Sequence, residues 1–142
     1  MVERNSGPNM FKHILLPTDG SDRSAGAIAA GIEFARATNA QVTGLFVVKP
    51  VYISEIDERP KPSAEAALAQ VAEQASRSGV ACECITVMGE TPQDGIVRVA
   101  TDRACDLIVM GTRGRSRVGK FILGSTAASI LADCEIPVLL FR

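Results

Sequence analysis

The chain has 142 residues, and its 15 lysine and arginine side chains nearly balance 16 aspartates and glutamates, for a formal net charge of −1. This length fits one compact domain, and a composition of 46% hydrophobic and 22% charged residues is typical of globular rather than disordered chains. The charge balance, with five phenylalanines, one tyrosine and no tryptophan, argues against a nucleic-acid partner.

The first ten residues are polar, and we expect a disordered tail over residues 1–10. They lack the apolar core of a secretory signal, and the sequence has no run of 18 apolar residues that would predict a membrane span. Met10 is an alternative start of the natural chain.

The apolar run at residues 13–16 predicts a buried strand that ends at Pro17. The segment Thr18-Asp19-Gly20-Ser21 supplies turn and N-cap chemistry for a helix of about fifteen residues. Its apolar stripe consists of Ala25, Ile28, Ile32 and Ala35. Gly26 and Gly31 weaken this helix but allow its backbone to lie close to a sheet.

Residues 41–48 predict a second strand, and the proline-containing, charged segment 49–62 predicts a surface loop. Ser63 is the expected N-cap of a second helix that Gly79 closes. The apolar stripe of that helix is Ala64, Leu68, Val71 and Ala75. Residues 80–88 predict a third strand.

The pair Thr91-Pro92 combines an N-cap residue with proline at the first helical position, and predicts a third helix that runs to about residue 103. Residues 107–110 predict a short buried strand, and residues 136–141 a last strand. Between them, residues 125–134 predict a helix whose inward side chains are Ala127, Ile130, Leu131 and Cys134.

Strands and helices thus alternate along the whole chain, which predicts an α/β domain with a parallel sheet, right-handed crossovers and helices on both faces. Open sheets of this kind bind ligands at the carboxyl ends of the strands, where the strand order reverses. The polar loops after the first and fourth strands are therefore the expected walls of a site.

The loop after the fourth strand is rich in glycine and in positive charge. Its glycines stand at 111, 114, 119 and 124, and its basic residues are Arg113, Arg115, Arg117 and Lys120. Close backbone approach at the glycines and a helix start at Gly124-Ser125-Thr126 suit a polyphosphate. The alternative is a flexible, solvated connection. Residues 114–121 also match a phosphate-binding P-loop frame, but Phe121 stands where magnesium binding needs serine or threonine.

The four cysteines, at positions 82, 84, 105 and 134, do not have the spacing of a zinc site. Cys82 and Cys84 are expected on one face of a strand, where a disulfide between them is strained. We therefore expect reduced, small buried side chains and a cytoplasmic location. His13, the one histidine, stands far from any candidate nucleophile and is not expected to be catalytic.

The pattern G-x2-G-x9-G-[S/T], formed by Gly111, Gly114, Gly124 and Ser125, together with Pro17-Thr18-Asp19, resembles the universal stress protein family, in its ATP-binding branch. The resemblance covers residues 11–142 as one domain. It implies a single open five-stranded parallel sheet of order 3-2-1-4-5 with four helices on both faces, a Rossmann-like, adenine nucleotide hydrolase-like fold.

The resemblance also implies an ATP site. Its phosphate- and ribose-binding residues match Gly111, Gly114, Gly124, Ser125 and Thr126. Its adenosine-binding residues match Pro17, Thr18, Asp19 and Val47, whose backbone reads the adenine edge, and Met110 lines the same cleft. Phe46 stands where many members carry histidine, a departure expected to alter packing more than binding.

The residue types add four candidate residues, three arginines and one aspartate, with two interpretations for each kind. Arg113, with Arg115 and Arg117, either screens the polyphosphate or points to solvent. Asp19 either hydrogen-bonds the nucleotide or helps to place a divalent ion carried by the phosphates; the alternative is a helix N-terminal acid stabilised by the dipole.

The leading hypothesis is a nucleotide-dependent stress-response or signalling module that binds ATP with Mg²⁺ or Mn²⁺ on the phosphates and is not an enzyme. The rivals are a slow ATPase or phosphotransferase, which needs more acid or histidine groups than these loops carry, and a dimeric scaffold without nucleotide. The apolar edge strand at 136–141 predicts a homodimer, as the resemblance also implies.

Overall fold

The computed structural model describes residues 11–50, 63–112, 114–115 and 121–142. The predicted tail at 1–10 and most of the predicted loop at 49–62 lie outside the described residues. None of the helices in the described part of the chain combines the length and apolar character needed to cross a bilayer.

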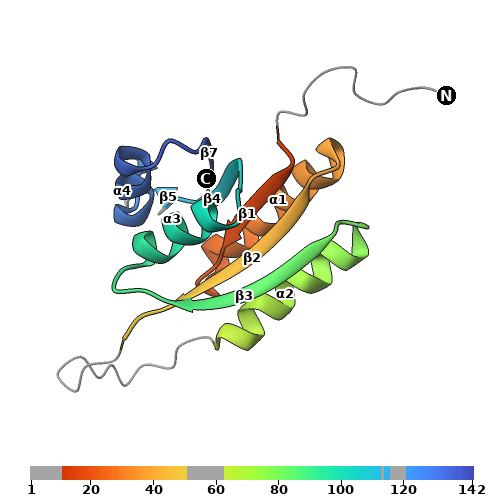
Figure 1. Cartoon of the computed structure of the whole chain (residues 1–142), viewed down its shortest axis with the longest axis horizontal. Helices are drawn as coiled ribbons and strands as arrows, with labels where there is room; N and C mark the ends of the chain where they lie inside the picture. The colour runs from red at the N-terminus through yellow and green to blue at the C-terminus, as the bar shows by residue number, and fades with distance from the viewer. Residues whose placement is uncertain (1–10, 51–62, 113, 116–120) are drawn as a thin grey trace.

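Strands and helices alternate as the sequence predicts, with one small hairpin added (Figure 1). The strands are β1 His13–Pro17, β2 Gln41–Val48, β3 Cys82–Met88, β4 Leu107–Gly111, β5 Gly114–Arg115, β6 Phe121–Ile122 and β7 Val138–Phe141. The helices are α1 Asp22–Thr38, α2 Ala64–Arg77, α3 Pro92–Asp102 and α4 Ser125–Asp133.

Five strands form one parallel sheet in the order β3-β2-β1-β4-β7, which is the predicted order 3-2-1-4-5 because β7 is the fifth strand of this sheet. The two-residue strands β5 and β6 form a separate antiparallel pair inside the glycine-rich loop, an element the sequence did not predict. The chain crosses from β1 outward to β3 and then returns to β4, so β1 and β4 are neighbours at the point where the order reverses.

Two hydrophobic clusters cover the two faces of the sheet. Ile14 and Leu16 of β1 pack with residues of α1 and α2, while Leu15, between them, packs with residues of α3 and α4. Figure 1 shows the same division of the helices between the two faces. All three side chains are fully buried, which explains why the central strand reads as a continuous apolar run.

The predicted N-caps are confirmed at α1, α2 and α3. Ser21 accepts a hydrogen bond from the Ser24 N–H, Ser63 from Ala66 and Thr91 from Asp94. Each cap satisfies one of the backbone donors that the first turn of a helix leaves free.

The glycines of α1 allow the close approach to the sheet that the sequence predicts. A β-carbon on Gly31 would collide with the side chain of Leu16, and one on Gly26 would lie 2.8 Å from the ring of Phe141. The buried stripe of α1 therefore includes Gly31 itself, with Ala27 in place of the predicted Ala25, which is half-buried.

Two other inward faces differ from prediction. In α2, Ala67 is buried and Ala64, in the first turn, is only half-buried. In α4, Leu131 is 47% exposed, so its predicted inward position was wrong. This short helix buries only Ala127 and Ile130, and the next residue along the helix is rotated by about 100° from Ile130 toward solvent.

Both edge strands begin later than predicted, β3 at Cys82 rather than Val80 and β7 at Val138 rather than Ile136. Pro137 has no N–H to donate, and its carbonyl instead accepts a hydrogen bond from Ile108 at 2.9 Å, just before the ladder begins.

Candidate functional site

An open cavity of about 240 Å³ lies at the carboxyl ends of β1, β2 and β4. This is just below the usual range of small-molecule sites, about 300 Å³ and more, so a large charged ligand would extend into solvent. The lining residues are Pro17, Thr18, Asp19, Ser21, Arg23, Ser24, Leu45, Val47, Pro92, Ile96, Met110, Gly111, Thr112, Gly124, Ser125, Thr126 and Ala127.

The loop after β1 forms a polar wall of the cavity, and its own hydrogen bonds fix its conformation. Thr18 is almost completely buried, and its N–H donates to the carbonyl of Leu45 at 2.8 Å. Its hydroxyl oxygen accepts the Gly20 N–H at 3.0 Å. Thr18 therefore extends the pairing of β1 with β2 by one hydrogen bond, and the hydrogen bond from Gly20 fixes the turn that follows.

Asp19 is the centre of this loop. Its Oδ1 accepts hydrogen bonds from the Ser21 N–H at 2.9 Å and from the Ser24 hydroxyl at 2.8 Å. Burial raises the pKa of Asp19, but the hydrogen bonds from Ser21 and Ser24 and the positive charge of Arg23 outweigh it, so the pKa lies below its ordinary value. The carboxylate is thus charged at neutral pH and fixes the first turn of α1.

The end of β4 forms the second wall. Met110 and Thr112 are buried, and between them Gly111 faces the backbone of α1. A β-carbon on Gly111 would lie 2.9 Å from the carbonyl oxygen of Arg23. Glycine is therefore needed at this position for contact with α1, a reason that is independent of any ligand.

The third wall is the amino end of α4, where Gly124 is the N-cap residue in an extended conformation. Helices α1, α2 and α3 each have a side-chain hydrogen bond at the N-cap and an acid in the first turn, whereas α4 has neither. The backbone donors of this turn and the positive end of the helix dipole face the cavity beside the Ser125 and Thr126 hydroxyls.

An apolar wall closes the opposite side. Val47 of β2 packs so tightly on α3 that a β-carbon on Gly95 would lie 2.7 Å from its methyl group. Pro92 and Ile96 of α3 and Leu45 of β2 continue this surface. The cavity therefore has one apolar side and one side rich in hydroxyl and backbone donors.

Most of the predicted site residues come together in this cavity. Those that line it are Pro17, Thr18, Asp19, Val47, Met110, Gly111, Gly124, Ser125 and Thr126. Gly114 lies in β5, where it pairs with Ile122, and Arg113 lies outside the described residues.

The sequence prediction missed Arg23, Ser24, Leu45, Pro92, Ile96, Thr112 and Ala127, and it identified Ser21 only as a cap. Arg23 and Ser24 follow the predicted Asp19 loop within one helical turn, a signal that was available in the sequence. Pro92 and Ile96 had no such signal, because only the packing of α3 on β2 brings them to the cavity.

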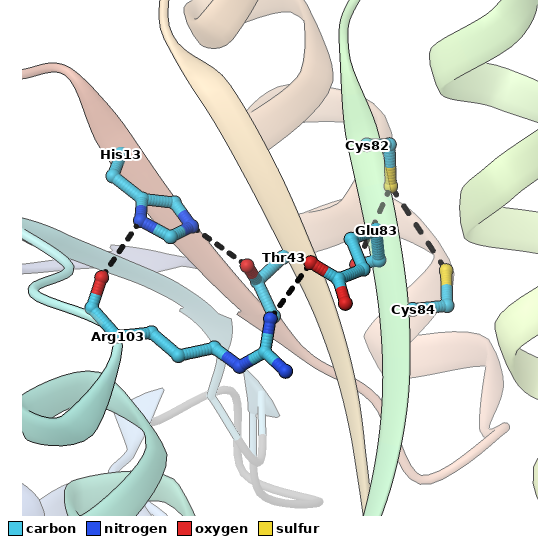
Figure 2. A network of polar contacts seen from close by, with 6 residues as sticks. All are labelled: His13, Thr43, Cys82, Glu83, Cys84 and Arg103. Atoms are coloured by element: carbon cyan, nitrogen blue, oxygen red, sulfur yellow. Dashed lines mark hydrogen bonds and ion pairs between the residues drawn. The ribbon is translucent and has the colours of Figure 1, made fainter.

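His13 lies at the opposite end of the sheet from the cavity, at the start of the central strand β1 (Figure 2). Its Nδ1 is 3.0 Å from the carbonyl oxygen of Arg103 and its Nε2 is 2.6 Å from the Thr43 hydroxyl. Since a carbonyl only accepts, Nδ1 carries the proton in this arrangement. His13 thus ties the end of α3 to β2 and does not line the cavity.

Asp19 is the one acidic side chain among the described residues that line the cavity. In the part of the chain that the structure describes, no group of three or more histidine, cysteine or acidic side chains is arranged to hold a metal ion. A divalent ion bound here would thus take most of its ligands from something other than the described side chains.

Comparison with known proteins gives a consistent result. The family model described as "Universal stress protein family" matches residues 10–142. A universal stress protein of Thermus aquaticus is 37% identical over 137 residues, which cover 94% of this chain and 100% of that protein. A universal stress protein of Methanocaldococcus jannaschii is 34% identical, over 96% of this chain and 85% of its own.

Solved structures show the same fold. A universal stress protein described as in complex with cAMP has a TM-score of 0.73 and 26% identity, and the match covers 93% of this chain and 97% of that one. A universal stress protein from Archaeoglobus fulgidus described as in complex with dAMP has a TM-score of 0.71 and 21% identity, covering 94% and 99% of the two chains.

Proposed function

Because the chain belongs to the universal stress protein family, we propose that it binds ATP in the cavity at the carboxyl ends of β1, β2 and β4. In this proposal nucleotide occupancy serves a stress-response or signalling role. The single observation that carries the proposal is the amino end of α4, which lacks a side-chain cap and faces the cavity. The similar structure described with cAMP supports an adenine nucleotide as the class of ligand.

The phosphates are assigned to the polar side of the cavity. The first backbone N–H groups of α4 and the hydroxyls of Ser125 and Thr126 supply donors for phosphate oxygens, and the helix dipole favours negative charge there. Gly124 adds no side chain that would block this approach. Arg23, in the first turn of α1, adds a positive charge to the lining of the cavity.

A Mg²⁺ or Mn²⁺ ion is part of the proposal as a companion of the phosphates. Magnesium sites that carry nucleotides commonly use one or two carboxylates with phosphate and water oxygens. Asp19, charged and at the rim of the same cavity, fits the place of one such carboxylate. The ion would supply charge neutralisation of the phosphates.

The adenosine part is assigned to the apolar side. The β1–β2 ladder ends at the pair Pro17 and Leu45, and the Leu45 carbonyl takes the Thr18 N–H just beyond it. Alternate residues of a strand direct their backbone groups to the same side, so the N–H and C=O of Val47 point past the end of β1. This backbone edge suits the hydrogen-bonding edge of adenine.

We propose binding rather than fast turnover, because phosphoryl transfer needs a positioned metal and a group that orients the nucleophile. Asp19 is the one acid among the described residues that line the cavity, and His13 lies at the amino end of β1, away from it. Incubation with labelled ATP separates the two functions. Turnover on the order of 1 s⁻¹ would favour an ATPase or phosphotransferase.

The direct test is to purify the protein without added nucleotide, denature it and separate the released small molecules by chromatography. We expect ATP or its AMP-like product. Gly124→Val places side-chain bulk at the amino end of α4 and should abolish the bound nucleotide. Unchanged occupancy in this variant would contradict the assignment of the site, and absence of nucleotide binding to the natural chain would favour the scaffold alternative.

We further propose a homodimer that forms through residues 136–141, in the cytoplasm. β7 is an edge strand of the sheet, and Leu139 and Phe141 on it are 41% and 42% exposed. Apolar edge strands of this kind are normally covered or paired, and a two-fold axis would pair β7 with its own copy.

A further inference from the structure

Two thiols lie side by side on β3, away from the cavity (Figure 2). The Sγ atoms of Cys82 and Cys84 are 3.9 Å apart, and both cysteines are free. They occupy the face of β3 that packs with α1 and α2, whereas Glu83, between them, points to the other face, where it pairs with Arg103 at 2.8 Å. Neither cysteine lines the cavity at the carboxyl ends of the strands.

The surroundings hold this pair in place. Cys84 lies opposite Gly44 of β2, and its thiol is 3.6 Å from the carbonyl oxygen of Leu68 in α2, to which it donates. A β-carbon on Gly44 would lie only 3.1 Å from the sulfur of Cys84. Because glycine stands there, the sulfur keeps its position between β2 and α2.

The strand geometry disfavours a disulfide between the two thiols. Residues i and i+2 of a strand have Cα atoms about 6.6 Å apart, near the upper limit for a disulfide. Burial, together with the neighbouring Cys84, raises the pKa of Cys82 to about 12, so this thiol is protonated at neutral pH and a ligand that binds its sulfur must displace the proton. The pair thus persists as a dithiol.

We propose that Cys82 and Cys84 form a two-sulfur binding site for a soft, thiophilic centre, and that monosubstituted trivalent arsenic is the class of ligand that it takes. An atom with bonds of about 2.3 Å to each sulfur would span the 3.9 Å gap at an angle of about 115°. That angle is wider than the bond angles of a pyramidal, three-bonded centre, so a small rotation of the two side chains must bring the sulfurs closer together. Linear two-coordinate binding would instead require the two sulfurs to move apart.

The number of protein side chains available as ligands determines which kind of thiophilic centre can bind here. The part of the chain that the structure describes has no third histidine, cysteine or acidic side chain grouped with this pair. Structural zinc sites take four protein ligands, so this pair does not meet that need. A monosubstituted arsenical takes two sulfurs and completes its three bonds with its own carbon.

The reaction is a substitution without electron transfer. An arsenical of the form R–As(OH)₂ exchanges two As–O bonds for two As–S bonds. Each S–H proton leaves with a departing hydroxide as water, and the arsenic stays in the +3 state. No oxidant is required, and the chelate also relieves the buried pair of its two S–H groups.

Phenylarsine oxide is the probe for the test, added to the fully reduced natural chain and followed by intact-mass spectrometry. We expect one arsenical per chain, on the peptide that contains Cys82 and Cys84. The adduct should survive millimolar glutathione, a monothiol, but be removed by 2,3-dimercaptopropanol. An adduct that glutathione removes, or one located on another peptide, would overturn the proposal without the need for any variant.

Variants sharpen the test. Cys82→Ser and Cys84→Ser should each lose the glutathione-resistant adduct, whereas Cys134→Ser, which removes a half-buried thiol at the end of α4, should keep it. A resistant adduct that persists in either β3 variant would contradict the two-sulfur site. Nucleotide occupancy should be unchanged in the arsenical-loaded protein, so the test of this site is independent of the test of the proposed nucleotide site.

Discussion

Gly111 lies directly beneath the backbone of Arg23, and a β-carbon at position 111 would come within 2.9 Å of the Arg23 carbonyl oxygen. This contact joins the end of β4 to the first turn of α1, two segments that are far apart in the sequence. Both residues line the cavity, so the contact fixes the distance between two of its walls.

Replacement of Gly111 by alanine should therefore destabilise the protein, because backbone atoms cannot move aside as the end of a flexible side chain can. We expect a loss of about 1–3 kcal/mol in the free energy of unfolding, the usual cost of overpacking. Urea denaturation measures it. Ala29→Ser, at an exposed position of α1, is the control and should stay within about 0.5 kcal/mol of the natural chain.

Gly124→Asp should separate stability from ligand binding. Aspartate is at least as good an N-cap residue as glycine, so the free energy of unfolding without ligand should be unchanged or higher by a few tenths of a kcal/mol. The new carboxylate would occupy the free N–H groups of α4 and repel phosphate, so ATP affinity should fall at least about tenfold. Calorimetric titration with ATP checks this, and undiminished affinity would place the phosphates elsewhere.

Asp19→Asn should lower stability in a pH-dependent way. The hydrogen bonds from Ser21 and Ser24 and the charge of Arg23 hold the pKa of Asp19 below its ordinary value despite the opposing effect of burial. The carboxylate therefore stabilises the fold fully above the unfolded-state pKa of about 3.9, and this contribution is lost as the pH falls through the lower folded-state pKa. Urea denaturation of both proteins at neutral and at strongly acidic pH should show a difference that shrinks on acidification. A difference independent of pH would count against the anionic role.

Thr43→Val should destabilise the sheet near the amino ends of its strands. Thr43 is 1% exposed, and its hydroxyl lies 2.6 Å from Nε2 of His13. Valine has no hydroxyl, so the substitution would leave Nε2 of His13 without this hydrogen-bond partner. We expect a cost of about 1–3 kcal/mol, measured by chemical denaturation. Thr86→Val, at an exposed position of β3, is the matched control. Equal stabilities of the two variants would show that the His13 contact contributes little.

Leu139→Lys should prevent the proposed homodimer. It places a charge at a position of β7 that is 41% exposed, and lysine on an edge strand opposes pairing with another edge. Sedimentation velocity should show a monomer for this variant and a dimer for the natural chain. Thr86→Lys, on the opposite edge strand β3, should remain dimeric. A dimer that survives Leu139→Lys would place the interface on another surface.

The order of helices and strands could be predicted because its signals are local. Ser21, Ser63 and Thr91 each cap a helix as expected, since capping depends on backbone groups within three residues of the cap. Leu131 shows the limit of this reasoning. Its spacing fits an inward face, but the short helix α4 buries only Ala127 and Ile130, and Leu131 is 47% exposed.

The candidate site was predictable on the sides where glycine spacing and strand ends mark it, at Pro17, Thr18, Asp19 and around Gly124. The apolar side was predicted only at Val47. Ile96 reaches the cavity because Val47 packs against Gly95 of α3, and no pattern within α3 itself signals that contact.

By itself, then, the sequence determined the alternation of strands and helices, the parallel sheet and the charged, glycine-rich loop that an overall charge of −1 conceals. These follow from periodicity and turn chemistry, which act over a few residues. Three relations came from the packing of the elements: Gly111 serves the contact with Arg23, α3 closes the cavity, and the sulfurs of Cys82 and Cys84 on β3 lie 3.9 Å apart. These relations depend on how helices pack across the sheet, and close packing is set by the shapes of all neighbours at once rather than by any one segment.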